Sequence, residues 1–505
     1  MQRSEITSSL SRSGLYVFIG KLIKFVLQYF TQILLINFLC PDDFGLMRYV
    51  TILLGIVNMI VEFGLGTAII QKQNITSEQI GSSFIVSLIW GGLLFLLFFL
   101  TAPIAASFFN DQRLVLLLRV AAIVIPFGAL NSIPKALLQK KMLFGKLAFT
   151  ESTAAVISSV VMVIMALRGY GTWSLVAGSV LLEVISMPLI FSIVRIPVFD
   201  MSRFKLSKDM LSFGIGIVFQ RIIDYLAYGT SFFVMGKFFS ATALGIYSIS
   251  HDLAVLPQRI ISAVLGTVVI STFSRIQHDT ETTKREFDKL LRFSTIIGMP
   301  ALVLMSFLST ELISVICFIR KNDTWLPAAD TLRWLSIVGV VYIVSIFPSP
   351  IWLSKGKVKE AGYWAVTMLV THIAAVFTGM QWGSKGIVIA MCIRGVSVMP
   401  LFIYLNYRLT GIPVSTYLKG LLPSGVCSIF MAVPVFLISA IVPGSSLARH
   451  FTVLSISAIS GTAVYLLILK VFFKDSLQIV VSFTRFSRKA GSTLVLETGN
   501  GEGTC

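Results

Sequence analysis

The chain has 505 residues, of which 56% are hydrophobic and only 13% are charged, with a mean hydropathy of +0.88. Soluble domains carry about 25% charged residues, so this composition excludes a soluble globular protein. Strands of membrane barrels alternate in hydropathy over about ten residues, whereas the apolar runs here last about 20 residues or more, which predicts helices. The net charge of +18 is typical of a membrane protein with positive cytoplasmic loops, and we expect no nucleic-acid partner.

Apolar segments long enough to cross a bilayer recur along the chain, and about 14 of them predict an all-α integral membrane protein. In chain order they cover residues 14–39, 44–70, 80–108, 114–138, 148–167, 173–194, 210–236, 243–273, 290–318, 326–352, 361–381, 386–406, 421–443 and 450–472. The connections are short, so we expect no sizeable soluble domain.

The loop charges predict the orientation. The side that holds the N-terminus carries about 24 lysines and arginines, against about seven on the opposite side. An even number of spans brings the C-terminal tail, with its own positive charges, back to the first side. We therefore expect a multi-pass protein of the cytoplasmic membrane with both termini in the cytoplasm.

An internal repeat organises the predicted helices. Displacing the chain by 200 residues places the first two segments on the seventh and eighth without a gap, so that Lys21 meets Arg221 and Gly45 meets Gly245. An offset of six helices preserves topology, which predicts two parallel-repeat six-helix lobes plus two extra C-terminal helices. Transporters often place their substrate site between such repeats.

These patterns divide the chain into four parts. We predict an N-lobe over residues 1–209, a C-lobe over 210–410, two additional helices over 411–475, and a partly disordered cytoplasmic tail over 476–505.

The first segment carries an unusual polar stripe, because Lys21, Lys24, Gln28 and Gln32 share one helical face. A charge near the bilayer centre costs several kcal/mol, so such residues usually face a bundle interior or a wet cavity. The stripe therefore predicts one wall of a cationic, water-filled cavity. Lys21 could instead reach the cytoplasmic interface with its long side chain.

Polar residues are also dense in the second, seventh and eighth segments, which the repeat relates to the first. The residues expected to bind an anionic substrate are Lys21, Lys24, Arg48, Arg221 and Arg259; those expected to line the cavity are Gln28, Gln32, Asn58 and Tyr228; and those proposed for ion coupling are Asp224, Asp252 and Glu62.

Structural alternatives stay open for several of these residues. Arg48 and Arg259 could bind neighbouring carbonyls or acids, and Arg221 could be neutralised by Asp224 three residues later. His251 is a candidate proton carrier, although a single histidine is more often structural. Three further acids, Glu151, Glu183 and Glu311, are expected near helix ends in packing or interfacial roles.

The sequence contains no phosphate-binding loop, zinc spacing or nucleophile elbow, and its five cysteines show no metal-like spacing. It also lacks a large loop on the side opposite the termini that could host glycan polymerisation or ligation. We therefore expect no enzyme activity, no metal and no bound cofactor; without an ATP motif, uphill movement would need an H⁺ or Na⁺ gradient.

The loop sequences resemble the polysaccharide transporter (Wzx-like) family, especially its WzxC/TuaB-type branch. This family shares a superfamily with the MurJ flippases and the multidrug MATE antiporters. The resemblance runs from about residue 10 to about residue 410 and rests on the order of these motifs: Pro41-Asp-Asp-Phe-Gly-Leu, Ala68-Ile-Ile-Gln-Lys72, Gly169-Tyr-Gly-Thr-Trp-Ser174, Ala243-Leu-Gly-Ile-Tyr-Ser248, Leu256-Pro257, Phe273-Ser-Arg-Ile-Gln-His-Asp279 and Trp325-Leu-Pro327.

The resemblance implies two lobes around a central cavity and the flipping of an undecaprenyl-diphosphate-linked oligosaccharide across the bacterial cytoplasmic membrane. It also implies an anionic cargo of exopolysaccharide, capsule or O-antigen synthesis, with a polymerase and a chain-length regulator as candidate partners beside membrane lipids. A multidrug/cation antiporter and a peptidoglycan-precursor flippase remain alternatives. A membrane glycosyl transfer enzyme or a scaffold without transport would leave the intramembrane charges unexplained.

Overall fold

The computed structural model describes residues 26–61, 65–72, 75–196, 229–262, 279–317, 323–442 and 446–479, together with residues 222, 225, 226, 269, 273 and 276. All regular elements in these ranges are helices. Ten helical segments there are long and apolar enough to cross a membrane, and one of them, Lys359–Thr410, contains two long helices. The predicted all-α membrane architecture is therefore confirmed.

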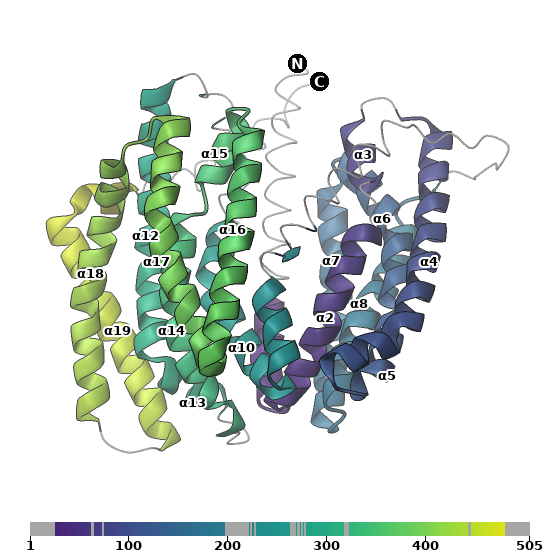
Figure 1. The fold of residues 1–505 in the computed structure, drawn as a ribbon, viewed down its shortest axis with the longest axis horizontal. Helices are drawn as coiled ribbons and strands as arrows, with labels where there is room; N and C mark the ends of the chain where they lie inside the picture. The colour runs from purple at the N-terminus through teal and green to yellow at the C-terminus, as the bar shows by residue number, and fades with distance from the viewer. Residues whose placement is uncertain are drawn as a thin grey trace, which may run out of the picture.

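The first group of helices is called the N-lobe below; most of it lies on the right in Figure 1, and its first helix lies near the centre of the molecule. It consists of Val26–Ile36, α2 (Pro41–Val61), α3 (Leu65–Gln71), α4 (Ser77–Phe109), α5 (Arg113–Ala121), α6 (Val124–Lys140), α7 (Phe144–Leu167) and α8 (Thr172–Phe191).

The second group, called the C-lobe below, begins with helical residues 229–238 and continues to α19. Its helices are α10 (Ala241–Ala254), the helical residues 256–262, α12 (Thr280–Phe307), α13 (Ser309–Ile316), α14 (Pro327–Val344), α15 (Pro348–Ser354), α16 (Val358–Gly379), α17 (Gly383–Thr410), α18 (Val414–Ile441) and α19 (Leu447–Phe472), with short 3₁₀ turns at Asp323–Trp325 and Met380–Trp382.

Local chemistry explains several helix ends. The Thr76 side chain accepts a hydrogen bond from the Gln79 amide, and the Gln79 side chain accepts one from the Thr76 amide, which forms a capping box before α4. Asp279 caps α12 in a similar way through the Thr282 amide. Gly411 ends α17 in the left-handed conformation that glycine adopts readily.

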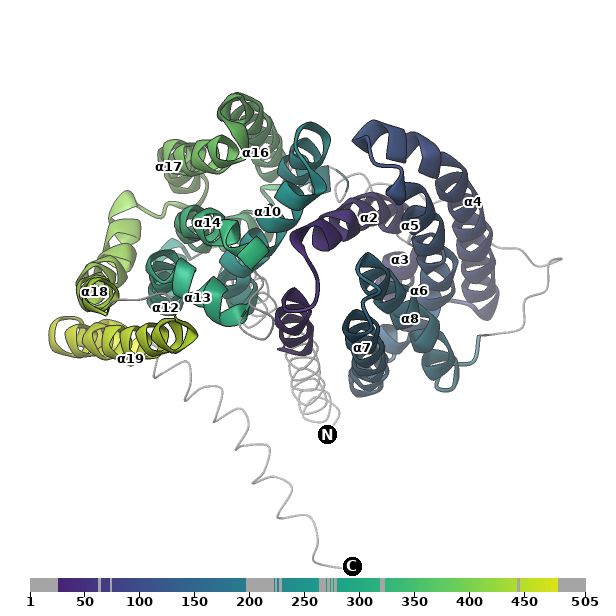
Figure 2. The same cartoon turned by 90° about the horizontal axis from the view of Figure 1, so that it is seen from below.

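The two lobes meet where α2 and α10 begin, and this region is called the joined end below. Among the labelled helices, the α2–α10 pair makes the main contact between the lobes. In Figure 1 the lobes converge at the bottom, where these helices lie, and are further apart at the top; Figure 2 shows α2 and α10 side by side at the centre.

Two glycines allow this close approach. A Cβ atom on Gly45 would overlap the carbonyl oxygen of Ala241, and a Cβ atom on Gly245 would overlap the carbonyl oxygen of Pro41. The contact is reciprocal, because Ala241 and Gly245 are the residues that the 200-residue repeat pairs with Pro41 and Gly45. Such reciprocity is the geometry expected when two equivalent helices pack about a twofold axis.

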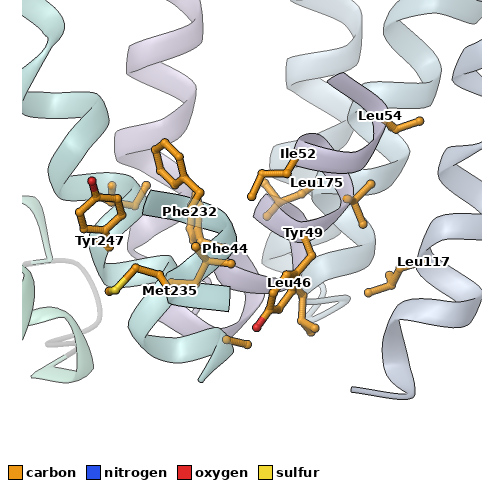
Figure 3. Packing of buried hydrophobic residues seen from close by; sticks show 14 of the residues in the cluster. Phe44, Leu46, Tyr49, Ile52, Leu54, Leu117, Leu175, Phe232, Met235 and Tyr247 are labelled. Atoms are coloured by element: carbon orange, nitrogen blue, oxygen red, sulfur yellow. The ribbon is translucent and has the colours of Figure 1, made fainter. Parts of the chain in front are cut away.

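A single apolar cluster spans the joined end and includes Tyr49 of α2, Phe232 and Met235 of the C-lobe, and Tyr247 of α10 (Figure 3). The Tyr49 hydroxyl donates to the Gly236 carbonyl at 2.8 Å, so this buried aromatic side chain crosses between the lobes. The buried Trp325 side chain in turn donates to the Leu39 carbonyl at 3.0 Å.

Several predicted spans differ from the observed helices. The predicted span 114–138 consists of two helices, α5 and α6, and 326–352 consists of α14 and α15. In the predicted span 243–273, α10 ends at Ala254 and helical residues resume at 256–262. Helix α12 starts ten residues before its predicted start of 290, because its charged first turns are stabilised by pairs such as Glu286–Lys289 and Asp288–Arg292, which hydropathy does not detect.

The predicted domain boundaries stay predictions. The boundary at 209/210 lies outside the described residues, as does most of the predicted tail. Residue 410 coincides with the end of α17.

Replacing Gly45 with alanine is expected to destabilise the protein by about 1–3 kcal/mol, because the new Cβ would force α2 away from the Ala241 backbone. The matched control is Gly92→Ala in α4, where a Cβ meets nothing within 4 Å. That change should be neutral or stabilising by about 0.5–1 kcal/mol, since alanine favours helices. Thermal unfolding of the purified variants measures both effects, and equal midpoints would contradict the close α2–α10 packing.

Candidate functional site

The candidate site is a cluster of charges next to the joined end, built from three of the residues that the sequence singled out; Asp252 lies in the last turn of α10, and Arg259 lies just beyond that helix. Arg48 of α2 contacts Asp252 of α10, with 2.5 Å between Nη2 and Oδ2. Arg259, seven residues further along the C-lobe, contacts the other oxygen of Asp252, with 3.3 Å between Nη2 and Oδ1. One carboxylate therefore binds two guanidinium groups, one from each lobe.

The first described helix joins the same cluster through Tyr29. Arg259 donates from Nη1 to the Tyr29 hydroxyl at 2.9 Å, and that hydroxyl lies 3.5 Å from the Asp252 carbonyl oxygen. Three segments that are distant in sequence thus meet at Asp252. Tyr29 is a residue that sequence reasoning missed, although it lies one position from Gln28 in the predicted polar stripe.

Aromatic side chains surround the ion pairs. The Arg48 guanidinium lies over the Phe232 ring, 4.8 Å from its centroid, which is favourable for a cation. The Tyr225 hydroxyl donates to the Ile52 carbonyl of α2 at 2.9 Å and fills the space beside Gly55. These contacts hold α2 against the C-lobe at the Arg48–Asp252 pair and one turn further along α2.

The cluster combines a shielded acid with an accessible cation. The side chains of Asp252, Arg48 and Arg259 are 13%, 24% and 47% exposed, respectively. Two arginines with one aspartate leave one unit of positive charge, and the more exposed arginine is the one on the C-lobe. Guanidinium groups bind carboxylate and phosphate oxygens well, so the cluster can attract an anionic group while it joins the lobes.

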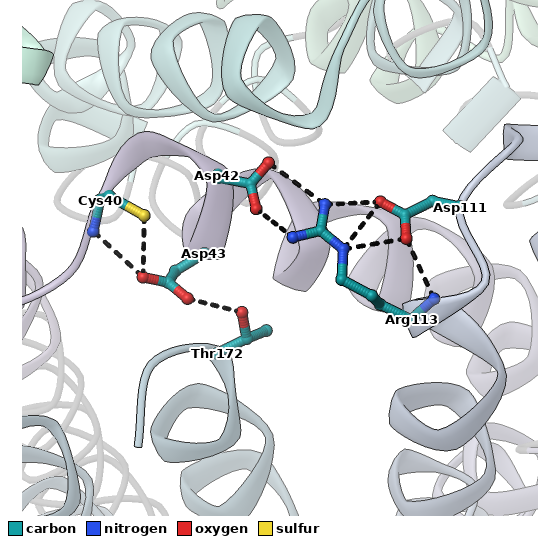
Figure 4. Close-up of polar contacts among 6 residues, drawn as sticks. All are labelled: Cys40, Asp42, Asp43, Asp111, Arg113 and Thr172. Atoms are coloured by element: carbon teal, nitrogen blue, oxygen red, sulfur yellow. Dashed lines mark hydrogen bonds and ion pairs between the residues drawn. The ribbon is translucent and has the colours of Figure 1, made fainter. Parts of the chain in front are cut away.

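A second set of polar contacts fixes the start of α2 within the N-lobe (Figure 4). Arg113 contacts Asp42 at 2.6 Å and Asp111 at 2.7 Å, while Thr172 donates to Asp43 at 2.8 Å. The hydrogen bonds from Arg113 hold the pKa of Asp111 below its ordinary value. These contacts attach the beginning of α2 to the α4–α5 connection and to the first residue of α8.

The other half of the joined end is fixed within the C-lobe. Ser250 of α10 donates to the Ala328 carbonyl of α14 at 2.9 Å. Tyr247 packs edge-on against Phe232, with ring centroids 5.2 Å apart. Each helix of the α2–α10 pair is therefore attached to its own lobe. If α2 and α10 separated, each helix would carry the rest of its lobe with it.

The remaining predicted site residues are distributed as follows. Gln28 and Asn58 are exposed, and Gln32 is partly exposed. Lys21, Lys24, Arg221, Tyr228, Asp224 and Glu62 lie outside the described residues, so the roles given to them stay predictions. Of the described candidates, Arg48, Asp252 and Arg259 come together, and both arginines contact an acid, as the structural alternative allowed.

The N-lobe contains a polar cluster around Glu183, whose predicted position near a helix end is wrong. Glu183 lies in the middle of α8, not near a helix end. Its carboxylate accepts a hydrogen bond from Asn131 of α6 at 2.8 Å and lies 3.4 Å from the Lys135 ammonium group. The partners are about 50 residues apart in sequence, so no local spacing could reveal the pair. Glu311, in contrast, lies in the first turn of α13, as expected, where it contacts Arg449 at 3.0 Å.

The C-lobe contains a mostly apolar cavity of about 250 Å³ that reaches the back of the ion cluster. His251 lines it, with its Nδ1 atom 4.0 Å from Asp252 Oδ1. His372 of α16 also lines it and is only 6% exposed, and Arg394 of α17 donates to Thr371 and to the Met368 carbonyl. Among the described residues, no group of three or more His, Cys, Asp or Glu side chains could hold a metal ion.

Comparisons with known proteins agree with the resemblance seen in the loops. A family model described as "Polysaccharide biosynthesis protein" matches residues 34–329. The teichuronic acid biosynthesis protein TuaB of Bacillus subtilis (strain 168) is 24% identical over 418 residues, which cover 81% of this chain and 85% of TuaB. The lipopolysaccharide biosynthesis protein WzxC of Escherichia coli (strain K12) is 24% identical over 353 residues, covering 67% of this chain and 68% of WzxC.

Among solved structures, the lipid II flippase MurJ in an inward closed conformation superposes with a TM-score of 0.74 at 16% identity, covering 92% of this chain and all of that chain. This likeness to MurJ concerns the fold. The segment matched by the family model spans more than half of the sequence. It includes both α2 and α10, the two helices of the joined end. The chain therefore belongs to the polysaccharide biosynthesis protein family.

Proposed function

We propose that the protein is a flippase that moves an undecaprenyl-diphosphate-linked oligosaccharide repeat unit across the bacterial cytoplasmic membrane by alternating access. The observation that carries the proposal is the α2–α10 contact, in which Arg48 and Arg259 from opposite lobes share Asp252. It is a closed contact between two lobes at one end of the molecule, and it is made of groups that can exchange partners.

The chemistry of the cargo explains why such a protein needs intramembrane cations. A lipid-linked oligosaccharide carries a diphosphate and many hydroxyl groups, and moving these groups uncovered through hydrocarbon is prohibitively costly. Lysine and arginine can replace the water around phosphate and carboxylate oxygens. In the proposal, Lys21, Lys24 and Arg221 provide this environment between the lobes, while the apolar carrier chain stays in the lipid.

The distribution of charge supports an orientation for the structure. The loops at the joined end contain the few positive residues of the less basic side, such as Arg113, Arg168 and Lys385. By the positive-inside rule this end faces away from the cytoplasm, and both termini lie in the cytoplasm. The lobes would then be closed toward the periplasm, so the next step of transport requires α2 and α10 to separate.

An ion gradient would supply the energy in this proposal, with H⁺ or Na⁺ as the coupling ion. Asp252 is the candidate coupling acid that the structure describes, and its protonation would release Arg48 and Arg259 at once. Asp224 and Glu62 remain the other candidates. A polymerase and a chain-length regulator of polysaccharide assembly are the proposed protein partners.

Two rival functions make different demands on the same cluster. A multidrug antiporter for cations needs an accessible acid, whereas Asp252 is shielded by two arginines. A peptidoglycan-precursor flippase would carry a similar anionic lipid, so only the identity of the cargo separates it from the proposal. The relatives that are named for teichuronic acid and lipopolysaccharide biosynthesis support a surface polysaccharide instead.

Deleting the gene in its host is expected to accumulate a diphosphate-linked repeat unit inside the cell while one surface polymer disappears. Mass spectrometry of the extracted lipids would identify that unit. Unchanged surface glycans together with lowered resistance to cationic compounds would contradict the proposal and favour the antiporter.

In the complemented deletion strain, Lys21→Ala, Lys24→Ala and Arg221→Ala should each reduce export of the polymer without loss of membrane insertion. Each change removes one cation from the predicted cavity. The control is Lys359→Ala, an exposed residue in the first turn of α16, which should export normally. Normal export by the triple variant at a normal protein level would refute the cavity assignment.

Asp252→Asn is expected to lower the stability of the closed state by about 1.5–3 kcal/mol, because Arg48 and Arg259 lose their shared acid. The matched control is Asp330→Asn, which also removes an acid with two cationic neighbours, Lys385 and Arg333, but inside the C-lobe.

We expect both variants to insert and only Asp252→Asn to impair export. Thermal unfolding and polymer export are the measurements. If both variants export equally well, the contact between the lobes has no role in transport.

A further inference from the structure

The structure contains a large crevice on the outside of the C-lobe, away from the charge cluster. Its volume is about 740 Å³, and side chains of α12, α14, α17 and α18 line it. In Figure 2, α18 is separated from α17 on this side of the molecule. Trp334, Ile337 and Phe436 line the crevice and are 39–60% exposed, so it opens toward the surface that the bilayer covers.

The lining changes character along the direction of the helices. Near the joined end it contains Arg333, Ser306 and Ser439, whereas Leu302 and Val340 line it further along α12 and α14. The start of α14 lies at the joined end, because the side chain of Trp325, two residues before this helix, donates a hydrogen bond to the Leu39 carbonyl just before α2. Positions later in α14 therefore lie further from the joined end. Polar groups at the membrane surface and apolar groups toward the bilayer centre match the two parts of a lipid molecule.

The polar part of the crevice has a net positive charge. Asp330 forms a close ion pair with Lys385 on α17, while Arg333 lies 4.0 Å from the other oxygen of the same carboxylate. These three residues together carry one positive charge. The Arg333 side chain is 47% exposed, so its guanidinium group remains accessible to a ligand.

We propose that this crevice binds one anionic phospholipid from the leaflet at the joined end, with the phosphate on Arg333 and an acyl chain along Leu302 and Val340. Positively charged pockets between membrane helices attract anionic headgroups. A zwitterionic lipid would gain the same apolar contacts without the net attraction to Arg333. The bound acyl chain would fill the space between α18 and the body of the C-lobe.

The site has a structural consequence for the last two helices. Arg449, just after the α18–α19 connection, contacts Glu311 of α13 and the carbonyls of Ser439 and Val442. This connection is therefore fixed at the joined end, while the crevice separates α18 from α14 and α17. A lipid in the crevice would complete the packing of α18 and raise the stability of the C-lobe.

The test uses the full-length protein, purified in detergent and freed of lipid. Its thermal unfolding midpoint is measured against added phosphatidylglycerol, with phosphatidylcholine as the zwitterionic comparison. We expect phosphatidylglycerol to raise the midpoint of the wild type and of Arg168→Gln, a control that removes an exposed arginine elsewhere near the joined end. Arg333→Gln should bind about tenfold more weakly, because one charge-assisted contact is lost.

A second variant tests the apolar part without touching the arginine. Ile337→Trp adds bulk inside the crevice and should reduce the effect of the lipid, while Ile429→Trp, on the exposed face of α18 outside the crevice, should not. Equal binding by Arg333→Gln and the wild type would overturn the proposal. So would equal effects of the two lipids, or tighter binding of undecaprenyl phosphate, which would assign the crevice to the carrier lipid.

None of these outcomes depends on the cargo, so the proposed transport function is tested separately.

Discussion

The arrangement of the two lobes depends on one shared carboxylate. Asp252 of the C-lobe binds Arg48 of the N-lobe and Arg259 of its own lobe, and Tyr29 brings the first helix to the same point. Charged groups are costly in a membrane unless their partners are close, so none of them can move far alone. The ion pairs hold the contact together. Because two arginines share one acid, the contact still carries a net positive charge. A closed contact with spare charge suits a transporter of anions.

The loop motifs that identify the family converge on this region. Asp42, Asp43 and Gly45 come from the first motif, Thr172 from the third and Gly245 from the fourth. The aspartates fix the start of α2 to α5 and α8, and the glycines let α2 and α10 touch through their backbones. These short motifs therefore supply several of the residues that position the contact between the lobes.

Much of this architecture could be predicted from the sequence, since hydropathy locates the spans and the 200-residue repeat pairs Gly45 with Gly245. The polar residues of the second and eighth segments stood out because intramembrane charges are rare, but they predicted a substrate cavity, and binding of Arg48 and Arg259 to an acid was only the structural alternative. Pairing over long distances could not be predicted: Lys135 and Glu183 are separated by 48 positions, and only the packing of α6 on α8 brings them together. The extension of α12 was missed because its stability comes from ion pairs, which a hydropathy profile counts as loop.

The central claim is that the α2–α10 contact opens when cargo crosses the membrane. The most direct measurement is the distance between spin labels at Tyr170 and Trp382, two exposed positions at the joined end of the N-lobe and of the C-lobe, in reconstituted protein. With lipid-linked oligosaccharide isolated from the deletion strain, the account predicts a second, longer distance that is absent without cargo. A single unchanged distance during active transport would contradict it.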